Sequence, residues 1–233
     1  TSGTIIQTKD TPSNVFATIN PLDNYYFGGT FANLNNTVTG SSSSYTYCTS
    51  TLGVSKGKYY IEAKLSADDS DGTRIGVVGR PSTATNNGIG DRQDEVMYQR
   101  NGNLKVNGTA TSSWGSTWAV NDIIGIALDL DNNKIYFSKN GTYQASGNPS
   151  TAANGVTITA ASSTIDGFYR FGFGDNNSTG SSTFQYNFGN GFFGTTAVAS
   201  AQTPDDGIGV FEYDPPTGYR ALCTKSINAQ EYS

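Results

Sequence analysis

The chain has 233 residues, a net charge of −5 and 14% charged residues, and it contains no histidine. Without histidine there is no Ser-His-Asp or Cys-His nucleophile system and no histidine-ligated zinc. No basic run suits a nucleic-acid groove, and no apolar stretch approaches the roughly 18 residues of a membrane helix. We therefore expect neither nucleic-acid binding nor membrane insertion.

The remaining composition is typical of a β protein with a neutral polar surface. Apolar residues make up 35% of the chain, but 14 Tyr and 12 Phe provide large side chains for a core. Asn, Ser, Thr and Gly replace charged residues, as in secreted, cell-surface or virion proteins more than in most cytosolic enzymes. The length fits one large all-β domain or two small ones.

Two segments are predicted to be β-strands. Residues 58–66 (KYYIEAKLS) place Tyr60, Glu62 and Lys64 on one face, which we expect to be exposed to solvent. The opposite, packed face carries Tyr59, Ile61, Ala63 and Leu65. Residues 123–130 (IIGIALDL) are apolar on both faces, which predicts a strand in the middle of a sheet.

Asn-Gly pairs predict the turns between strands. Both residues tolerate the positive φ of a two-residue type I′ hairpin, so we expect hairpins at 101–102 and 140–141. Residues 148–164 are small and polar, which indicates a surface excursion with one edge strand. Many short strands with closely spaced turns are typical of a sandwich.

The stretch that begins at Asp129 has two interpretations, a calcium loop or a turn. An EF-hand loop needs Gly at its sixth position and Glu at its twelfth, but here these positions are Lys134 and Asn140. Residues 131–133 are turn formers, so the stretch is predicted to be a hairpin that belongs to the scaffold.

A second acidic stretch, ADDSDGTR, holds Asp68, Asp69 and Asp71 within one loop. Three neighbouring carboxylates could bind Ca²⁺, but no distal ligand is identifiable, and a solvated acidic turn is the favoured interpretation. We therefore expect no cofactor, and we expect folding not to depend on calcium.

Glycoside hydrolysis needs two carboxylates about 5 to 10 Å apart. The four glutamates are isolated in the sequence, and the run from Asp91 to Glu95 is read as the polar entrance of a strand. Enzymatic activity is not expected.

The two cysteines, Cys48 and Cys223, lie near opposite ends of the chain. Paired, they would join the two ends across a very long loop. Unpaired, they would be small buried apolar residues. Both alternatives remain open from the sequence.

Residues 118–141 (WAVNDIIGIALDLDNNKIYFSKNG) resemble the signature of the SPRY domain. Residues 52–65 (LGVSKGKYYIEAKL) resemble the "GxxxGKxYWEV" strand of that family, with Ile61 where Trp is usual. The segments FYRFGFGD and FQYNFGN are similar to its later core strands. Together these matches cover roughly residues 45 to 190.

The resemblance implies an all-β fold, a two-sheet antiparallel β-sandwich of the concanavalin A-like jelly-roll type, with no enzymatic activity. We expect residues 1–44 to form an N-terminal extension and first strands, residues 45–224 the sandwich, and residues 225–233 a C-terminal tail. Continuation of that tail in a longer protein is left open.

The flanking segments, residues 12–24 and 211–227, resemble those of SPRY-bearing structural proteins in tailed, particularly marine, bacteriophages. The expected function is a virion structural or adhesion module, such as a fibre, spike or capsid decoration, located in the virion. Its expected partners are other virion proteins, with a host-surface glycan or protein receptor and a homo-oligomer as open alternatives. The alternative function is a lectin-like carbohydrate-binding module of a secreted or cell-surface, hence extracellular, protein.

Family members bind partners through loops at one end of the sandwich. The loops predicted to do so here are residues 80–93 and 111–118, with the candidate binding residues Asn86, Asn87, Asp91, Arg92 and Trp114. Trp118 is expected in the core. Trp114 has two interpretations, an exposed anchor or a cap on a sheet edge.

Overall fold

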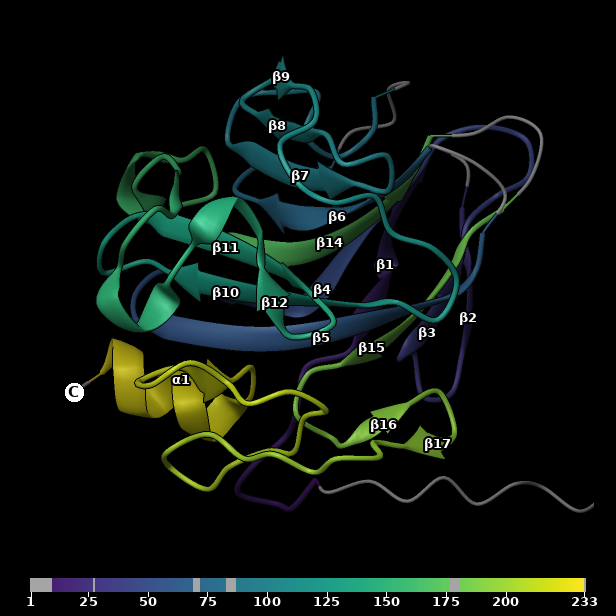
Figure 1. The fold of residues 1–233 in the computed structure, drawn as a ribbon. Helices are drawn as coiled ribbons and strands as arrows, with labels where there is room; N and C mark the ends of the chain where they lie inside the picture. Colours follow the sequence, from purple (N-terminus) through teal and green to yellow (C-terminus); the bar gives the residue numbers. More distant parts are fainter. Residues whose placement is uncertain (1–9, 27, 69–71, 83–86, 177–180, 233) are drawn as a thin grey trace, which may run out of the picture.

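The computed structural model describes residues 10–26, 28–68, 72–82, 87–176 and 181–232, and two β-sheets face each other in it (Figure 1). The first sheet has seven strands among these residues. In order across the sheet they are β1 (Ile19–Tyr26), β4 (Thr46–Val54), β14 (Tyr169–Asp175), β6 (Thr73–Val78), β7 (Glu95–Gln99), β8 (Leu104–Val106) and β9 (Thr109–Thr111).

The second sheet has nine strands in the described part of the chain. Its main path runs through β12 (Thr142–Tyr143), β11 (Lys134–Lys139), β10 (Ile123–Asp129), β5 (Lys58–Ala67), β15 (Thr183–Asn187), β3 (Thr37–Thr39) and β2 (Thr30–Ala32). Two short strands join it at the side, β13 (Val156–Thr157) against β11 and β18 (Arg220–Ala221) against β5. Of the strand pairings described, β18 with β5 is parallel and the others are antiparallel.

Short elements connect or flank the two sheets. They are the hairpin of β16 (Phe192–Phe193) and β17 (Thr196–Ala197), the 3-10 turns η1 (Gln144–Ser146), η2 (Pro149–Thr151) and η3 (Ala161–Ser163), and the helix α1 (Thr224–Glu231). This arrangement confirms the predicted two-sheet antiparallel β-sandwich. Residues 148–164 form the predicted surface excursion, with β13 as its edge strand.

The main core lies between the two sheets, where the predicted inner face of β5 is fully buried. β10 pairs with both β11 and β5, and all seven of its residues are buried, which confirms its central position. Aromatic side chains fill much of the space; Phe184, for example, contacts Phe173 with ring centroids 5.5 Å apart. Rings of this size contribute strongly to burial.

The predicted turns are present. β7 and β8 are joined at residues 100–103, with Gly102 at φ 88°. β11 and β12 are joined by Asn140 at φ 49° and Gly141 at φ 79°, which is the type I′ conformation. Between β10 and β11, the carboxylate of Asp129 accepts hydrogen bonds from the backbone and side chain of Asn132. The stretch that resembled a calcium loop is therefore part of the scaffold.

One prediction for β5 is wrong. Tyr60 and Glu62 were expected on a solvent-exposed face, but they are 1% and 0% exposed. The C-terminal segment lies across this outer face (Figure 1), and Phe211 contacts the Tyr60 ring edge-on at 5.0 Å. The second sheet therefore has apolar packing on both sides, and the outer cluster includes Phe211, Tyr219 and Cys223.

Glu62 anchors this covering segment. Its carboxylate accepts hydrogen bonds from the backbone N–H groups of Glu212 and Tyr213, both at 2.8 Å. The hydroxyl of Tyr60 and the amide of Asn187 also donate to it. Burial raises the pKa of Glu62 to about 7, although these four donors act to lower it.

The helix α1 continues the covering segment at the beginning of β5. Lys58 donates its backbone N–H to Gln230 Oε1 at 2.7 Å, and Gln230 Nε2 returns a hydrogen bond to the Lys58 carbonyl. Ile227 packs against the main core. Most of the segment predicted to be a C-terminal tail is thus a helix docked on the sandwich.

The disulfide alternative is not realised, because both cysteines are free and buried. Cys48 lies in the main core between the sheets, whereas Cys223 lies in the cluster on the outer face of the second sheet. The sheet itself separates the two thiols. They are the small buried apolar residues of the second interpretation.

Truncation of the core should lower stability strongly. Leu128 and Phe137 are 0% and 1% exposed, so replacing either with Ala should cost about 2 to 5 kcal/mol of unfolding free energy. Leu22→Ala is a control, since Leu22 is 89% exposed. Urea denaturation of the three variants measures the effect. Equal stability of all three would contradict the placement of the β10–β11 hairpin.

The protonation of Glu62 should make stability depend on pH. Its pKa of about 7 in the folded chain lies above the ordinary 4.5, so its contribution is fully present below the unfolded value and is lost as pH rises through 7. Between about pH 5 and pH 8, the wild type should lose on the order of 1 to 3 kcal/mol that Glu62→Gln does not lose. Thermal unfolding across this range measures the difference. Parallel pH profiles for the two proteins would contradict it.

Candidate binding site

Residues 112–118 lie at the end of the sandwich where β7 turns into β8. Gly115 donates its backbone N–H to the Gly102 carbonyl, and Trp118 donates its own to the Arg100 carbonyl. The indole Nε1 of Trp118 donates to the Gln99 carbonyl at 2.9 Å. The loop is thus fixed on the β7–β8 turn by backbone contacts.

The two tryptophans have different positions. Trp118 is 2% exposed and belongs to the main core, as expected. Trp114 is half-buried, and its ring packs edge-on against Tyr98 at 5.4 Å and Phe137 at 6.0 Å. The structure thus favours the interpretation of Trp114 as a cap on the sheet edge.

The other predicted loop lies elsewhere. Its residues 87–94 lie on the outer face of the first sheet, where Ile89 packs with Tyr47, Val78 and Met97. Gly90 accepts a hydrogen bond from Gly108, in the turn between β8 and β9. The described part of this loop therefore bonds to the β8–β9 turn, whereas residues 112–118 bond to the β7–β8 turn at the other end of β8.

Asp91 and Arg92 hold the loop in place. Asp91 pairs with Arg74 at 3.0 Å and with Lys105 at 2.5 Å, and these two cations hold its pKa below the ordinary value against the effect of burial. Arg92 pairs with the buried Glu95 at 2.7 Å. Both predicted binding residues thus have internal partners. Asn87 also has an interaction, and Asn86 lies outside the described residues.

A concave surface lies beside the loop at residues 112–118. It has a volume of about 490 Å³, within the range of ligand sites. It is lined by Arg100, Asn101, Thr117, Trp118, Ala119 and Lys139. Sequence patterns did not indicate Arg100 or Lys139, because each stands alone at the end of a strand.

The two basic residues of this surface are held by acidic neighbours. Lys139 Nζ donates to the Thr117 carbonyl at 2.8 Å and pairs with Asp122 at 3.1 Å. Arg100 pairs with Asp68. Neutralised in this way, the surface suits a neutral polar partner better than an anionic one.

The carboxylates do not assemble a metal centre within the described residues, where no group of three potential ligands occurs. Asp68 is the partner of Arg100, while Asp69 and Asp71 lie outside the described part. The expectation that folding needs no calcium stays a prediction. No helix in the described segments is both long enough and apolar enough to span a membrane.

Replacement of Trp114 should affect stability. Because its ring packs on Tyr98 and Phe137, Trp114→Ala should lower the unfolding free energy by about 1 to 3 kcal/mol. Trp114→Phe keeps a ring at the same place and should recover most of the loss. Chemical denaturation measures both variants. A Trp114→Ala variant as stable as the wild type would indicate an exposed anchor instead.

Comparison with known proteins gives no match among curated sequences, but it gives matches among solved structures. The SPRY domain of human HERC1 is 21% identical over 72% of this chain and 96% of its own, with a TM-score of 0.55. A human SPRY domain is 18% identical over 64% of this chain and 91% of its own, with a TM-score of 0.48. The stonustoxin structure is 13% identical over 74% of this chain and 27% of its own, with a TM-score of 0.50.

At such identities, likeness to the HERC1 domain shows the fold alone. The family match is stronger evidence, because the SPRY domain family matches residues 58–185, which is more than half of the 233 residues. Its first residue begins β5 and its last lies in β15, so the match spans the centre of both sheets. The chain belongs to the SPRY domain family.

Proposed function

We propose that this protein is a non-enzymatic interaction module that binds a protein partner through the concave surface at residues 100–101, 117–119 and 139. SPRY domains are generally protein-interaction modules. The observation that carries the proposal is the surface itself, about 490 Å³ in volume, whose rim is fixed by backbone hydrogen bonds. A rigid site loses little conformational entropy on binding.

The chemistry of this surface indicates how a partner is bound. Its cations are paired and its other lining residues are neutral, so long-range electrostatic steering is weak. Contact therefore depends on hydrogen bonds and close packing, and binding should change little between low and moderate salt.

The proposed setting is a virion, where the chain serves as a structural or adhesion protein of a tailed bacteriophage. Support comes from the flanking segments, residues 12–24 and 211–227, and from the low content of charged residues. The human SPRY domains and stonustoxin, to which the chain is similar, add nothing to this assignment.

The lectin-like alternative has less support. Sugar rings stack on an exposed aromatic face, and Trp114 was the candidate for that face. Its ring is instead half-buried against Tyr98 and Phe137.

Photo-crosslinking from the concave surface tests the proposal. A photoreactive residue at position 117, which is exposed, should capture another virion protein in purified particles. The same residue at position 109 is the matched control, because Thr109 is exposed on the edge strand β9. Absence of the chain from particles would contradict the virion setting. Capture from position 109 and none from position 117 would contradict the site.

A further inference from the structure

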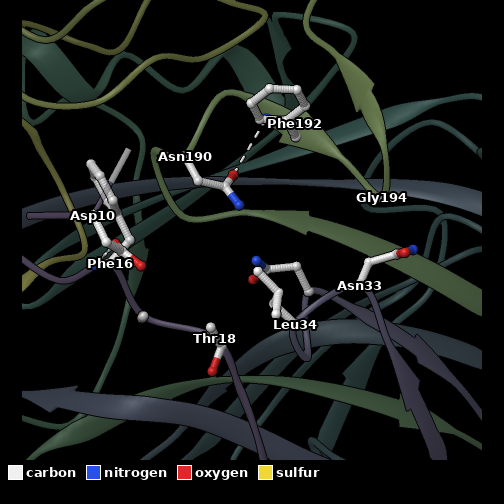
Figure 2. A pocket seen from close by; sticks show the side chains of 10 residues that line it. Asp10, Phe16, Thr18, Asn33, Leu34, Asn190, Phe192 and Gly194 are labelled. Carbon is white, nitrogen blue, oxygen red and sulfur yellow. Dashed lines mark hydrogen bonds between the residues drawn. The ribbon is translucent and has the colours of Figure 1, made fainter. Parts of the chain in front are cut away.

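A second pocket lies outside the region matched by the family. It is formed by the segment before β1, the turn between β2 and β3, and the residues that follow β15 (Figure 2). Its volume is about 30 Å³, enough for one small polar group. The lining residues are Asp10, Phe16, Ala17, Thr18, Asn33, Leu34, Asn36, Asn190, Phe192 and Gly194.

One side chain of this pocket has an unmet hydrogen-bonding group. Asn36 is 8% exposed, and its Oδ1 is buried and accepts no hydrogen bond from the protein. Its backbone is fully used, because its N–H donates to the Asn33 carbonyl and its carbonyl accepts from Tyr186. A buried carbonyl without a donor destabilises a fold, so its presence in a pocket points to a ligand that donates.

Two further side-chain amides line the pocket, and in each of them one of the two polar atoms is already in a hydrogen bond within the protein. Asn33 Nδ2 donates to Thr37 Oγ1 at 2.9 Å, which leaves its Oδ1 as an acceptor. Asn190 Oδ1 accepts from the backbone N–H of Phe192 at 3.3 Å, and its Nδ2 points into the pocket (Figure 2). The pocket therefore presents the unmet acceptor of Asn36 and the donor of Asn190.

The charge and shape of the pocket restrict the chemical class of its ligand further. None of the ten lining residues is basic, so an anion has no countercharge. The carboxylate of Asp10 already accepts the backbone N–H of Phe16 at 2.9 Å. Phe16 and Phe192 add apolar walls, and Leu34 at the rim is 58% exposed. A neutral polar group with an apolar stem fits these surroundings.

The turn that builds the pocket is conformationally unusual. Asn33, Leu34 and Asn35 have φ values of 52°, 57° and 63°, all in the left-handed region. Asn visits this region readily, but Leu does so at a cost, and such strain is retained where it positions a group. Here it places Leu34 at the surface while Asn36 lines the pocket.

We propose that this pocket binds the primary carboxamide of an Asn or Gln side chain from a protein partner. A carboxamide carries its donor and its acceptor on two different atoms, so it can serve Asn36 Oδ1 and Asn190 Nδ2 together. Leu34 contacts the partner beside the inserted side chain. This site is separate from the concave surface at residues 100–101, 117–119 and 139, and it does not depend on the function proposed for that surface.

Four small probes of nearly the same shape test the chemistry. Acetamide both donates and accepts, acetone and acetate only accept, and acetamidinium only donates. NMR titration should give shifts for acetamide at the amides of residues 33–36 and 190–194, with binding at least about tenfold tighter than for the other three, as expected for one lost hydrogen bond. Equal binding of acetone or acetate, or no shift with any probe, would overturn the proposal.

The variant Asn36→Leu removes the amide but keeps the size of the side chain. Because its Oδ1 accepts nothing from the protein, this variant should melt at the wild-type temperature or above it while losing the acetamide response. Asn187→Leu is the matched control, since its amide bonds to Gly189, Gly191 and Val210, and it should melt at a lower temperature. If Asn36→Leu melts as low as this control, Asn36 is a satisfied structural residue and the proposal fails.

Discussion

Each sheet is apolar on both faces: the inner faces meet in the core, and the outer faces also carry apolar clusters. The structure therefore depends on covering these two outer faces. Two segments do so, and carboxylates fix both of them: Glu62 and Glu95 are buried, and Asp91 is half-buried. Glu62 holds the C-terminal segment by two backbone N–H groups. Glu95 and Asp91 hold residues 87–94 through Arg92 and Arg74. Carboxylates suit this task, because each oxygen accepts several hydrogen bonds.

This use of the outer faces determines where a partner can bind. A β-sandwich offers two sheet faces and two ends, and here both faces are occupied by the protein's own chain. The concave surface beside Trp118 lies at one end, and the pocket around Asn36 is formed by segments that flank the family region. Both proposed sites therefore lie where the sandwich is not already covered.

Local sequence patterns predicted the parts of the fold that local forces determine. The alternation in β5, the two apolar faces of β10 and the turns at residues 101–102 and 140–141 are all present. The outward face of β5 was predicted wrongly, because the residues that cover Glu62 follow it by 150 positions in the chain. The ion pairs of Asp91 were also missed, because its partners Arg74 and Lys105 belong to other strands that only the fold brings beside it. Asn36 gave no signal, since an unmet hydrogen bond is visible only once its neighbours are in place.

Native-state hydrogen exchange at the backbone amides of Glu212 and Tyr213 tests the central role of Glu62 most directly. If the C-terminal segment is an integral part of the fold, these two amides should exchange only through global unfolding, with the same free energy as the amides of β10. Exchange of both amides at a much lower free energy, while β10 stays protected, would contradict this account. The segment would then be a loosely attached cover.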